Sequence, residues 1–219
     1  METNKRTQYM SMIVAAVFII VASVQGYRNI GLPPVIIVGG SGIIGFIMWY
    51  RTYLKHPIDP KIILPLFLLT VTALEVHMCE EYLTGFGPAM SRLFNITWTE
   101  QTFLMIFAFI GPILYTLTAL GLYYKVPIAG FIAWFIFIGP GVAEFTHFIF
   151  PLLKPDVMPE VKTVLSQNIK GTFVAGMHNY WFNLTGKYYF AGMYTAVLPM
   201  IPGIYAIYTM IKLNRKLTD

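Results

Sequence analysis

The chain has 219 residues, of which 57% are hydrophobic and 11% are charged, and its mean hydropathy is +0.65. Soluble domains carry about 25% charged residues, so this composition excludes a water-exposed globular surface and favours an integral membrane protein. The formal charge of +5 comes from Lys and Arg scattered at the ends of apolar runs, a pattern typical of membrane anchoring and not of nucleic-acid binding. The single cysteine, Cys79, excludes an internal disulfide.

Six apolar runs follow one another along the chain, each close to the roughly 20 residues that cross about 30 Å of hydrocarbon as a helix. They cover residues 10–26, 33–50, 61–84, 102–124, 127–152 and 187–211. Charged and turn-forming residues separate them. The sequence therefore predicts an all-α integral membrane protein in which about six transmembrane helices form one bundle, with residues 1–219 as a single domain.

The second run contains Gly39-Gly40-Ser41-Gly42, with no lysine or acidic partner that a phosphate-binding loop would have. Small residues allow two membrane helices to approach closely. We therefore predict a helix contact at this position.

The basic residues of the short loops are divided unequally between the two sides of the predicted bundle. Arg28 and Arg92 lie on one side, and nine lie on the other: Lys5, Arg6, Arg51, Lys55, Lys61, Lys125, Lys212, Arg215 and Lys216. The positive-inside rule then predicts a multi-pass protein with both termini in the cytoplasm and residues 153–186 facing outward. In a bacterium the membrane would be the plasma (inner) membrane.

The third run contains several charged residues, each of which costs about 2.5 kcal/mol or more at membrane depth and is therefore a candidate for function. His77, Glu80 and Glu81 stand at i, i+3 and i+4, which places them on one helical face. Glu75 points elsewhere, so we expect it to be structural or to orient a ligand. Cys79 is off the shared face, so we expect it to pack rather than to bind metal.

The fifth run contains Glu144 and His147 in the Glu-x-x-His spacing of di-iron carboxylate bundles. The third and fifth runs cross in the same direction, and both motifs lie in the last third of their run, so we expect them at similar depth. His178 precedes the sixth run on the same side. The predicted metal ligands are His77, Glu80, Glu81, Glu144, His147 and His178.

Three imidazoles and three carboxylates suit iron, manganese or zinc better than calcium or magnesium. Two ions could share the six donors, or one zinc could use three of them while the others orient the ligands. A structural role is also open, as a set of hydrogen-bonded Glu–His pairs in the membrane interior. His178 stands among aromatic residues that could instead form an interfacial belt.

At these residues the sequence resembles the HXXEE family of small integral membrane proteins. The resemblance rests on His77 to Tyr82 (HMCEEY), on Glu144 to His147 with Pro151, and on Tyr188 to Pro199. It implies metal ligands at His77, Glu80, Glu81 and His147, and it names no substrate. Members often show Pro-Gly-Gly after the first motif, whereas this chain has Gly85-Phe86-Gly87-Pro88.

A more distant similarity is to sterol isomerases of the emopamil-binding type, which place a His and a Glu four residues apart on a membrane helix, as His77 and Glu81 are here. It implies metal-free chemistry in which His77 and Glu81 move a proton across a double bond of a lipid or terpenoid while Glu144 stabilises a carbocation.

The leading hypothesis from the sequence is a metal-dependent oxidoreductase with a non-haem di-iron centre. It would act on a lipophilic small molecule that enters from the membrane lipid, with electrons from a separate donor. With zinc in place of iron, the same ligands suit a hydrolase. The same residues are also compatible with the metal-free isomerase and with a proton or ion transporter, although the chain shows no inverted repeat.

Overall fold

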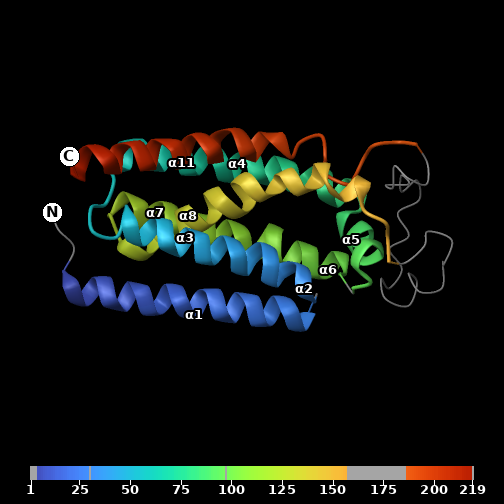
Figure 1. Ribbon diagram of the computed structural model, residues 1–219, viewed down its shortest axis with the longest axis horizontal. Coiled ribbons are helices and arrows are strands. Elements are labelled where there is room, and N and C mark those ends of the chain that lie inside the picture. Colours follow the sequence, from blue (N-terminus) through green and yellow to red (C-terminus); the bar gives the residue numbers. More distant parts are fainter. Residues whose placement is uncertain (1–3, 30, 97, 157–185, 219) are drawn as a thin grey trace.

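The computed structural model describes residues 4–29, 31–96, 98–156 and 186–218, which form an all-α bundle with no β-strand in those ranges (Figure 1). Five helical segments are long and apolar enough to cross a membrane: Lys5–Arg28, Leu32–Arg51, Pro60–Thr84, Gln101–Tyr123 and Pro127–Leu152. They confirm the first five predicted spans to within a few residues. His178 and most of the predicted outward segment lie outside the described residues.

The first two spans are α1 (Lys5–Asn29) and a composite of α2 (Leu32–Pro34), the π-helical segment η1 (Val35–Gly39) and α3 (Gly40–Arg51). The third is α4 (Pro60–Thr84), followed by the short helix α5 (Phe86–Phe94). The fourth joins α6 (Glu100–Phe103), the π-helical η2 (Leu104–Ile110) and α7 (Gly111–Tyr123). The fifth joins α8 (Pro127–Val142) to two 3₁₀ segments, η3 (Ala143–Phe148) and η4 (Phe150–Leu152).

The sixth predicted run, 187–211, is only partly helical, so its predicted start is wrong. The helix α11 covers Val197–Thr218, and residues 187–196 form a loop before it. Gly192 in this loop has a φ of +82°. The backbone N–H groups of Tyr194 and Thr195 donate to the Glu80 side chain instead of to a preceding helical turn. These bonds to Glu80 compete with helix formation, and the apolar composition of the run does not reveal them.

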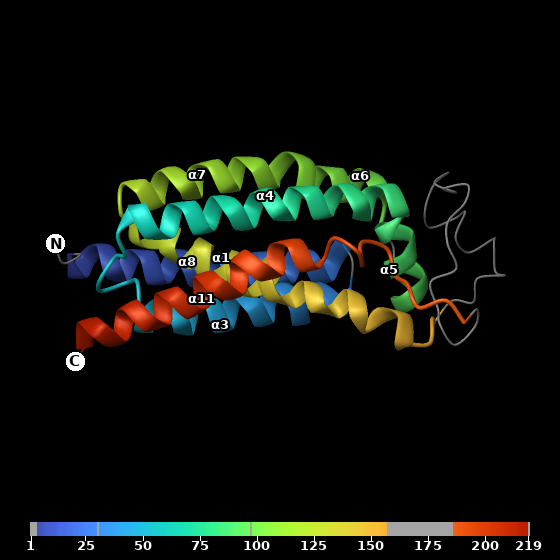
Figure 2. The same ribbon diagram turned by 90° about the horizontal axis from the view of Figure 1, so that it is seen from above.

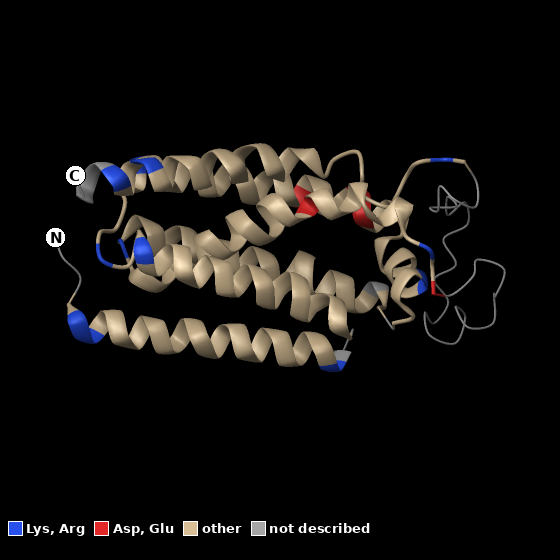
Figure 3. Ribbon diagram, in the orientation of Figure 1, with Lys and Arg blue, Asp and Glu red and all other residues tan. Residues whose placement is uncertain are grey.

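The helix α8 lies at the centre of the bundle, in contact with α3, α7 and α11, while α11 also packs along α4 (Figures 1 and 2). The start of α1 and the end of α11 lie at the same end of the bundle, which we call the terminal end. Figure 3 shows Lys and Arg gathered mainly at this end. The cytoplasmic location of the termini stays a prediction.

The glycine-rich stretch of the second span makes the predicted helix contact. A Cβ on Gly42 would lie 2.9 Å from the Ile19 side chain of α1, and one on Gly45 would lie 3.2 Å from the Phe135 backbone N of α8. Small residues at these positions thus allow α3 to approach two neighbouring helices.

The helices enclose two hydrophobic cores. The larger lies toward the terminal end and includes the fully buried Trp49, Phe131 and Trp134. The smaller, around Phe86, Phe150 and Phe190, lies where α4 and η3 meet the loop 187–196. The polar residues singled out from the sequence sit beside this second core.

Candidate metal centre

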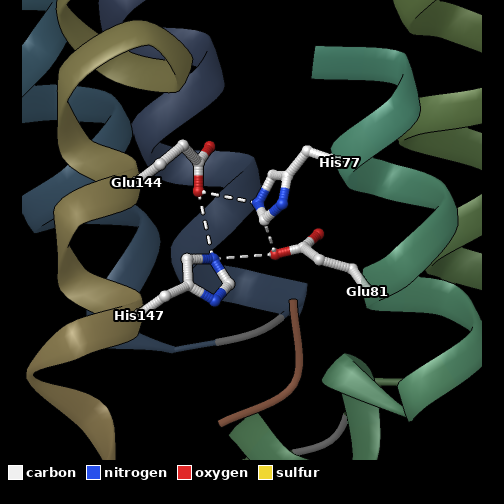
Figure 4. A group of neighbouring side chains, drawn as sticks. All are labelled: His77, Glu81, Glu144 and His147. Atoms are coloured by element: carbon white, nitrogen blue, oxygen red, sulfur yellow. Dashed lines mark hydrogen bonds and ion pairs between the residues drawn. The ribbon is translucent and has the colours of Figure 1, made fainter. Parts of the chain in front are cut away.

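Four side chains from two helices converge on one point near the second core. His77 and Glu81 come from α4, and Glu144 and His147 come from η3 (Figure 4). One donor atom from each residue lies within 4.8 Å of the other three, and this arrangement could hold a metal ion. The side chains of His77, Glu81 and His147 are 0%, 2% and 1% exposed, and that of Glu144 is 15% exposed.

The local helix geometry explains why each pair points the same way. His77 and Glu81 are one turn apart in a regular α-helix, so they share a face. Pro140 lies inside α8, and two residues after it the helix ends and tightens into the 3₁₀ segment η3. Because a 3₁₀-helix has three residues per turn, Glu144 and His147 at i and i+3 are eclipsed. Their spacing therefore aligns the two donors better than an α-helix would.

The shortest approaches all join an imidazole nitrogen to a carboxylate oxygen. His77 Nε2 lies 3.5 Å from Glu81 Oε1 and 3.2 Å from Glu144 Oε2. His147 Nε2 lies 3.1 Å from Glu81 Oε1 and 3.0 Å from Glu144 Oε2. Four ligands held about 2.0–2.1 Å from one ion in a tetrahedron are about 3.3–3.4 Å apart. The four nitrogen–oxygen separations are close to that value, and the nitrogen–nitrogen and oxygen–oxygen pairs lie within 4.8 Å.

The loop 187–196 bonds to the other nitrogen of each imidazole. His147 Nδ1 lies 2.7 Å from the Ala191 carbonyl oxygen, which only accepts, so Nδ1–H is the donor. His77 Nδ1 lies 3.1 Å from Thr195 Oγ1. The Thr195 hydroxyl donates its hydrogen to Glu80 Oε2 at 2.6 Å, so it accepts from His77 Nδ1–H. When both rings are neutral, the Nε2 lone pair of each then faces the two carboxylates.

Lone pairs on two nitrogens and two oxygens cannot satisfy one another, so a positive species must stand between them. A divalent ion with two neutral imidazoles and two carboxylates has no net charge, which suits a buried site at membrane depth. Two protons, one on each imidazole, balance the charges equally well. Glu81 Oε2, however, is buried and has no hydrogen-bond partner among the described residues. A metal ion could bind that oxygen, since carboxylates ligate through one or both oxygens.

One side of the site is closed by backbone and aromatic rings. A Cβ on Gly192 would lie 2.7 Å from Glu81 Cγ, 2.9 Å from His77 Cε1 and 3.0 Å from His147 Cε1. The loop therefore lies directly against three of the four donors, and only glycine fits there. The rings of Phe86, Phe150 and Phe190 have their centroids 5.2, 5.9 and 6.2 Å from that of His147. These contacts keep water away from the buried donors.

The structure does not bring all of the predicted ligands together. Glu80 is turned to the loop, where its carboxylate accepts four hydrogen bonds. His178 lies outside the described residues. Glu75 is apart from the four donors, and its Oε1 is buried without a hydrogen-bond partner in the described chain. Cys79 is not among the donors either; it is exposed, so the packing expected for it is wrong.

Sequence reasoning missed the residues that orient the two histidines. Thr195, Ala191 and Gly192 all stand in a stretch that the apolar pattern assigned to the sixth span. Ala191 acts through its backbone carbonyl, which no side-chain motif reports. Gly192, near the start of the predicted sixth span, was the one available signal, since glycine permits a positive φ.

Comparisons of the chain with models of protein families, with curated proteins and with solved structures find no match. The chemistry of the site is therefore inferred from its geometry.

Proposed function

We propose that the chain is a multi-pass membrane metalloenzyme in which His77, Glu81, Glu144 and His147 hold one iron ion. The observation that supports this best is the convergence of two Nε2 atoms on two carboxylate oxygens, while both Nδ1 atoms bond to the loop 187–196. Four donors suffice for one ion. A di-iron centre in a helical bundle commonly uses four Glu and two His, which is more than the described residues bring together here.

Iron is the preferred metal because two imidazoles with carboxylates are typical of non-haem iron sites that react with oxygen. Such an ion supplies one-electron and oxygen chemistry, which leads us to an oxidoreductase with an external electron donor. The protein itself fixes the imidazoles through Ala191 and Thr195, and its surrounding phenylalanines exclude water.

The surroundings favour a lipophilic substrate. Glu144 is the most exposed of the four donors; Phe145, which follows it in η3, is 45% exposed, and Ile149, which follows η3, is 40% exposed. The exposed surface next to Glu144 in the chain is therefore apolar. This supports a substrate that enters from the bilayer, such as a fatty-acyl, terpenoid or aromatic compound.

A second candidate function is a metal-free isomerase. Each carboxylate lies within about 3.5 Å of both imidazoles, so the same four groups could share and transfer two protons. Proton transfer of this kind would survive a strong chelator, whereas the proposed oxidoreductase would be inactivated by it.

Elemental analysis of the detergent-purified protein tests the proposal. The variant is His77→Ala with His147→Ala, and the matched control is His56→Ala, since His56 is exposed and is not one of the donors. We expect about one iron per chain in the wild type and the control, and none in the double variant. Stoichiometric zinc in protein made with excess iron would redirect the proposal to a hydrolase. No metal after anaerobic loading would favour the isomerase.

A further inference from the structure

The carboxylate of Glu80 connects α4 to the loop 187–196 through both of its oxygens. Oε1 accepts from the Tyr189 hydroxyl at 3.1 Å and from the Tyr194 backbone N–H at 3.3 Å. Oε2 accepts from the Thr195 backbone N–H at 2.7 Å and from its hydroxyl at 2.6 Å. Hydrogen bonds to an ionised carboxylate are roughly twice as strong as neutral ones. We call these four bonds the Glu80 clamp.

The loop that the clamp holds supplies the hydrogen-bond acceptor for each imidazole. The Thr195 hydroxyl accepts from His77, and the Ala191 carbonyl accepts from His147. Between them, Gly192 lies against the donor side chains, and its N–H donates to Thr84 Oγ1 at 3.2 Å. A displacement of this loop would therefore release both rings at once.

We propose that Glu80 is a positioning residue for the metal centre. Through the clamp it fixes the loop 187–196, and through the Thr195 hydroxyl it holds His77 with Nε2 toward the other donors. This inference rests on the proposed function, because the orientation of Nε2 matters for binding a cation. It separates two adjacent acids: Glu81 is a ligand, and Glu80 acts through Thr195.

The helix geometry accounts for the separation. Successive residues of an α-helix are rotated by about 100°, so Glu80 and Glu81 stand on opposite sides of the direction in which His77 points. Glu81 faces η3, and Glu80 faces the loop 187–196. A partner that orients a metal-bound histidine changes metal affinity by about 10–100-fold when it is lost.

The test compares four variants by Co²⁺ binding, with the visible spectrum reporting coordination. Thr195→Val removes the link between Glu80 and His77, whereas Thr195→Ser keeps the hydroxyl. Tyr189→Phe removes a bond to the other carboxylate oxygen and leaves the link intact. We expect Glu80→Gln and Thr195→Val each to weaken Co²⁺ binding by about 10–100-fold with an unchanged spectrum. The double variant should bind Co²⁺ about as weakly as either single variant, because both substitutions break the same link. Thr195→Ser should bind as the wild type does, and Tyr189→Phe should lose less than Thr195→Val.

Two results would overturn the inference. Equal affinity in Thr195→Val and Thr195→Ser would show that the link to His77 has no effect. An altered spectrum, with one oxygen donor fewer by X-ray absorption in Glu80→Gln, would make Glu80 a ligand.

A metal-independent measurement keeps this inference separate from the proposed function. In the metal-free protein, hydrogen exchange of the Tyr194 and Thr195 amides should become at least about tenfold faster in Glu80→Gln, because both N–H groups lose their charged acceptor. If the wild type binds no metal, the proposed function fails, and the exchange rates still decide whether the clamp exists. Unchanged exchange would refute it.

Discussion

The two ends of the bundle are held together by different interactions. At the terminal end, α3 and α8 meet through large aromatic side chains, with Trp49, Phe131 and Trp134 all fully buried. At the opposite end, α4 and η3 meet through His77, Glu81, Glu144 and His147. Apolar packing depends on volume and has little direction, whereas the polar group depends on the orientation of each ring and carboxylate. The metal end therefore needs a loop to hold its side chains.

At the terminal end two buried tryptophans make separate hydrogen bonds that share no partner. Trp49 Nε1 donates to the Pro127 carbonyl at 2.8 Å, and Trp134 Nε1 donates to Thr52 Oγ1 at 3.0 Å. At the metal end one oxygen of each carboxylate, Glu81 Oε1 and Glu144 Oε2, faces both imidazoles. A single substitution should thus have a confined effect at the terminal end and a shared effect at the metal end.

The largest effect is expected from removing both carboxylate charges in the variant Glu81→Gln with Glu144→Gln. Loss of one partner from a buried charged group costs about 3–5 kcal/mol, so metal affinity should fall by at least about 100-fold. Competition with a chelator of known affinity measures the change. The control is Asp59→Asn at the terminal end, where asparagine also caps a helix and metal binding should be unchanged. An equal loss of metal affinity in Asp59→Asn would contradict the difference between the two ends.

A cavity at the terminal end should reduce stability without affecting metal. Trp134 is fully buried, and Trp134→Ala is expected to lower the free energy of unfolding by about 3–5 kcal/mol. Unfolding in SDS titrations measures this change, and elemental analysis measures the metal content of the folded fraction. Loss of metal from that fraction would mean that the two ends are coupled.

A methyl group at Gly192 should damage the metal end through sterics. Gly192→Ala adds about 1–3 kcal/mol of backbone strain and a contact below 3.0 Å with Glu81 and His77. Gly186→Ala is the matched control, because Gly186 has a φ of +69° and nothing within 4 Å of its added Cβ. We expect both variants to be strained and only Gly192→Ala to lose metal affinity. Retained affinity in Gly192→Ala would show that the loop can move away from the site.

The smallest effect is expected at Tyr53, whose hydroxyl is buried without a partner among the described residues. Tyr53→Phe should change the free energy of unfolding by less than about 1 kcal/mol at neutral pH, or stabilise the protein slightly. Burial raises the pKa of Tyr53, so wild-type stability is complete below the unfolded pKa of about 10 and is lost as the pH rises above it. Unfolding measured between pH 9 and about 11 should show a smaller loss in the variant. An equal loss would assign the effect to other groups.

Much of the site could be predicted because regular helices relate residues close in sequence. His77 with Glu81, and Glu144 with His147, were paired by spacing, and their similar depth followed from counting spans. The direction of Glu80 could not be predicted, because i+3 and i+4 differ by about 100° around the helix and only a neighbouring segment decides what each meets. Nor could the spacing of Glu144 and His147 reveal the change from α- to 3₁₀-helix.

The sequence by itself determined that the chain is an all-α protein with helices apolar enough to cross a membrane, and it placed the first five of them. The reason is that hydropathy over about 20 residues reports the cost of moving a segment into lipid. It also determined which charged groups lie within those segments. Only the tertiary structure decided which of these groups share a centre and that Thr195 and Ala191 set both imidazoles. Such contacts join residues more than 40 positions apart, and hydrogen bonds over that separation depend on how the chain packs and not on local pattern.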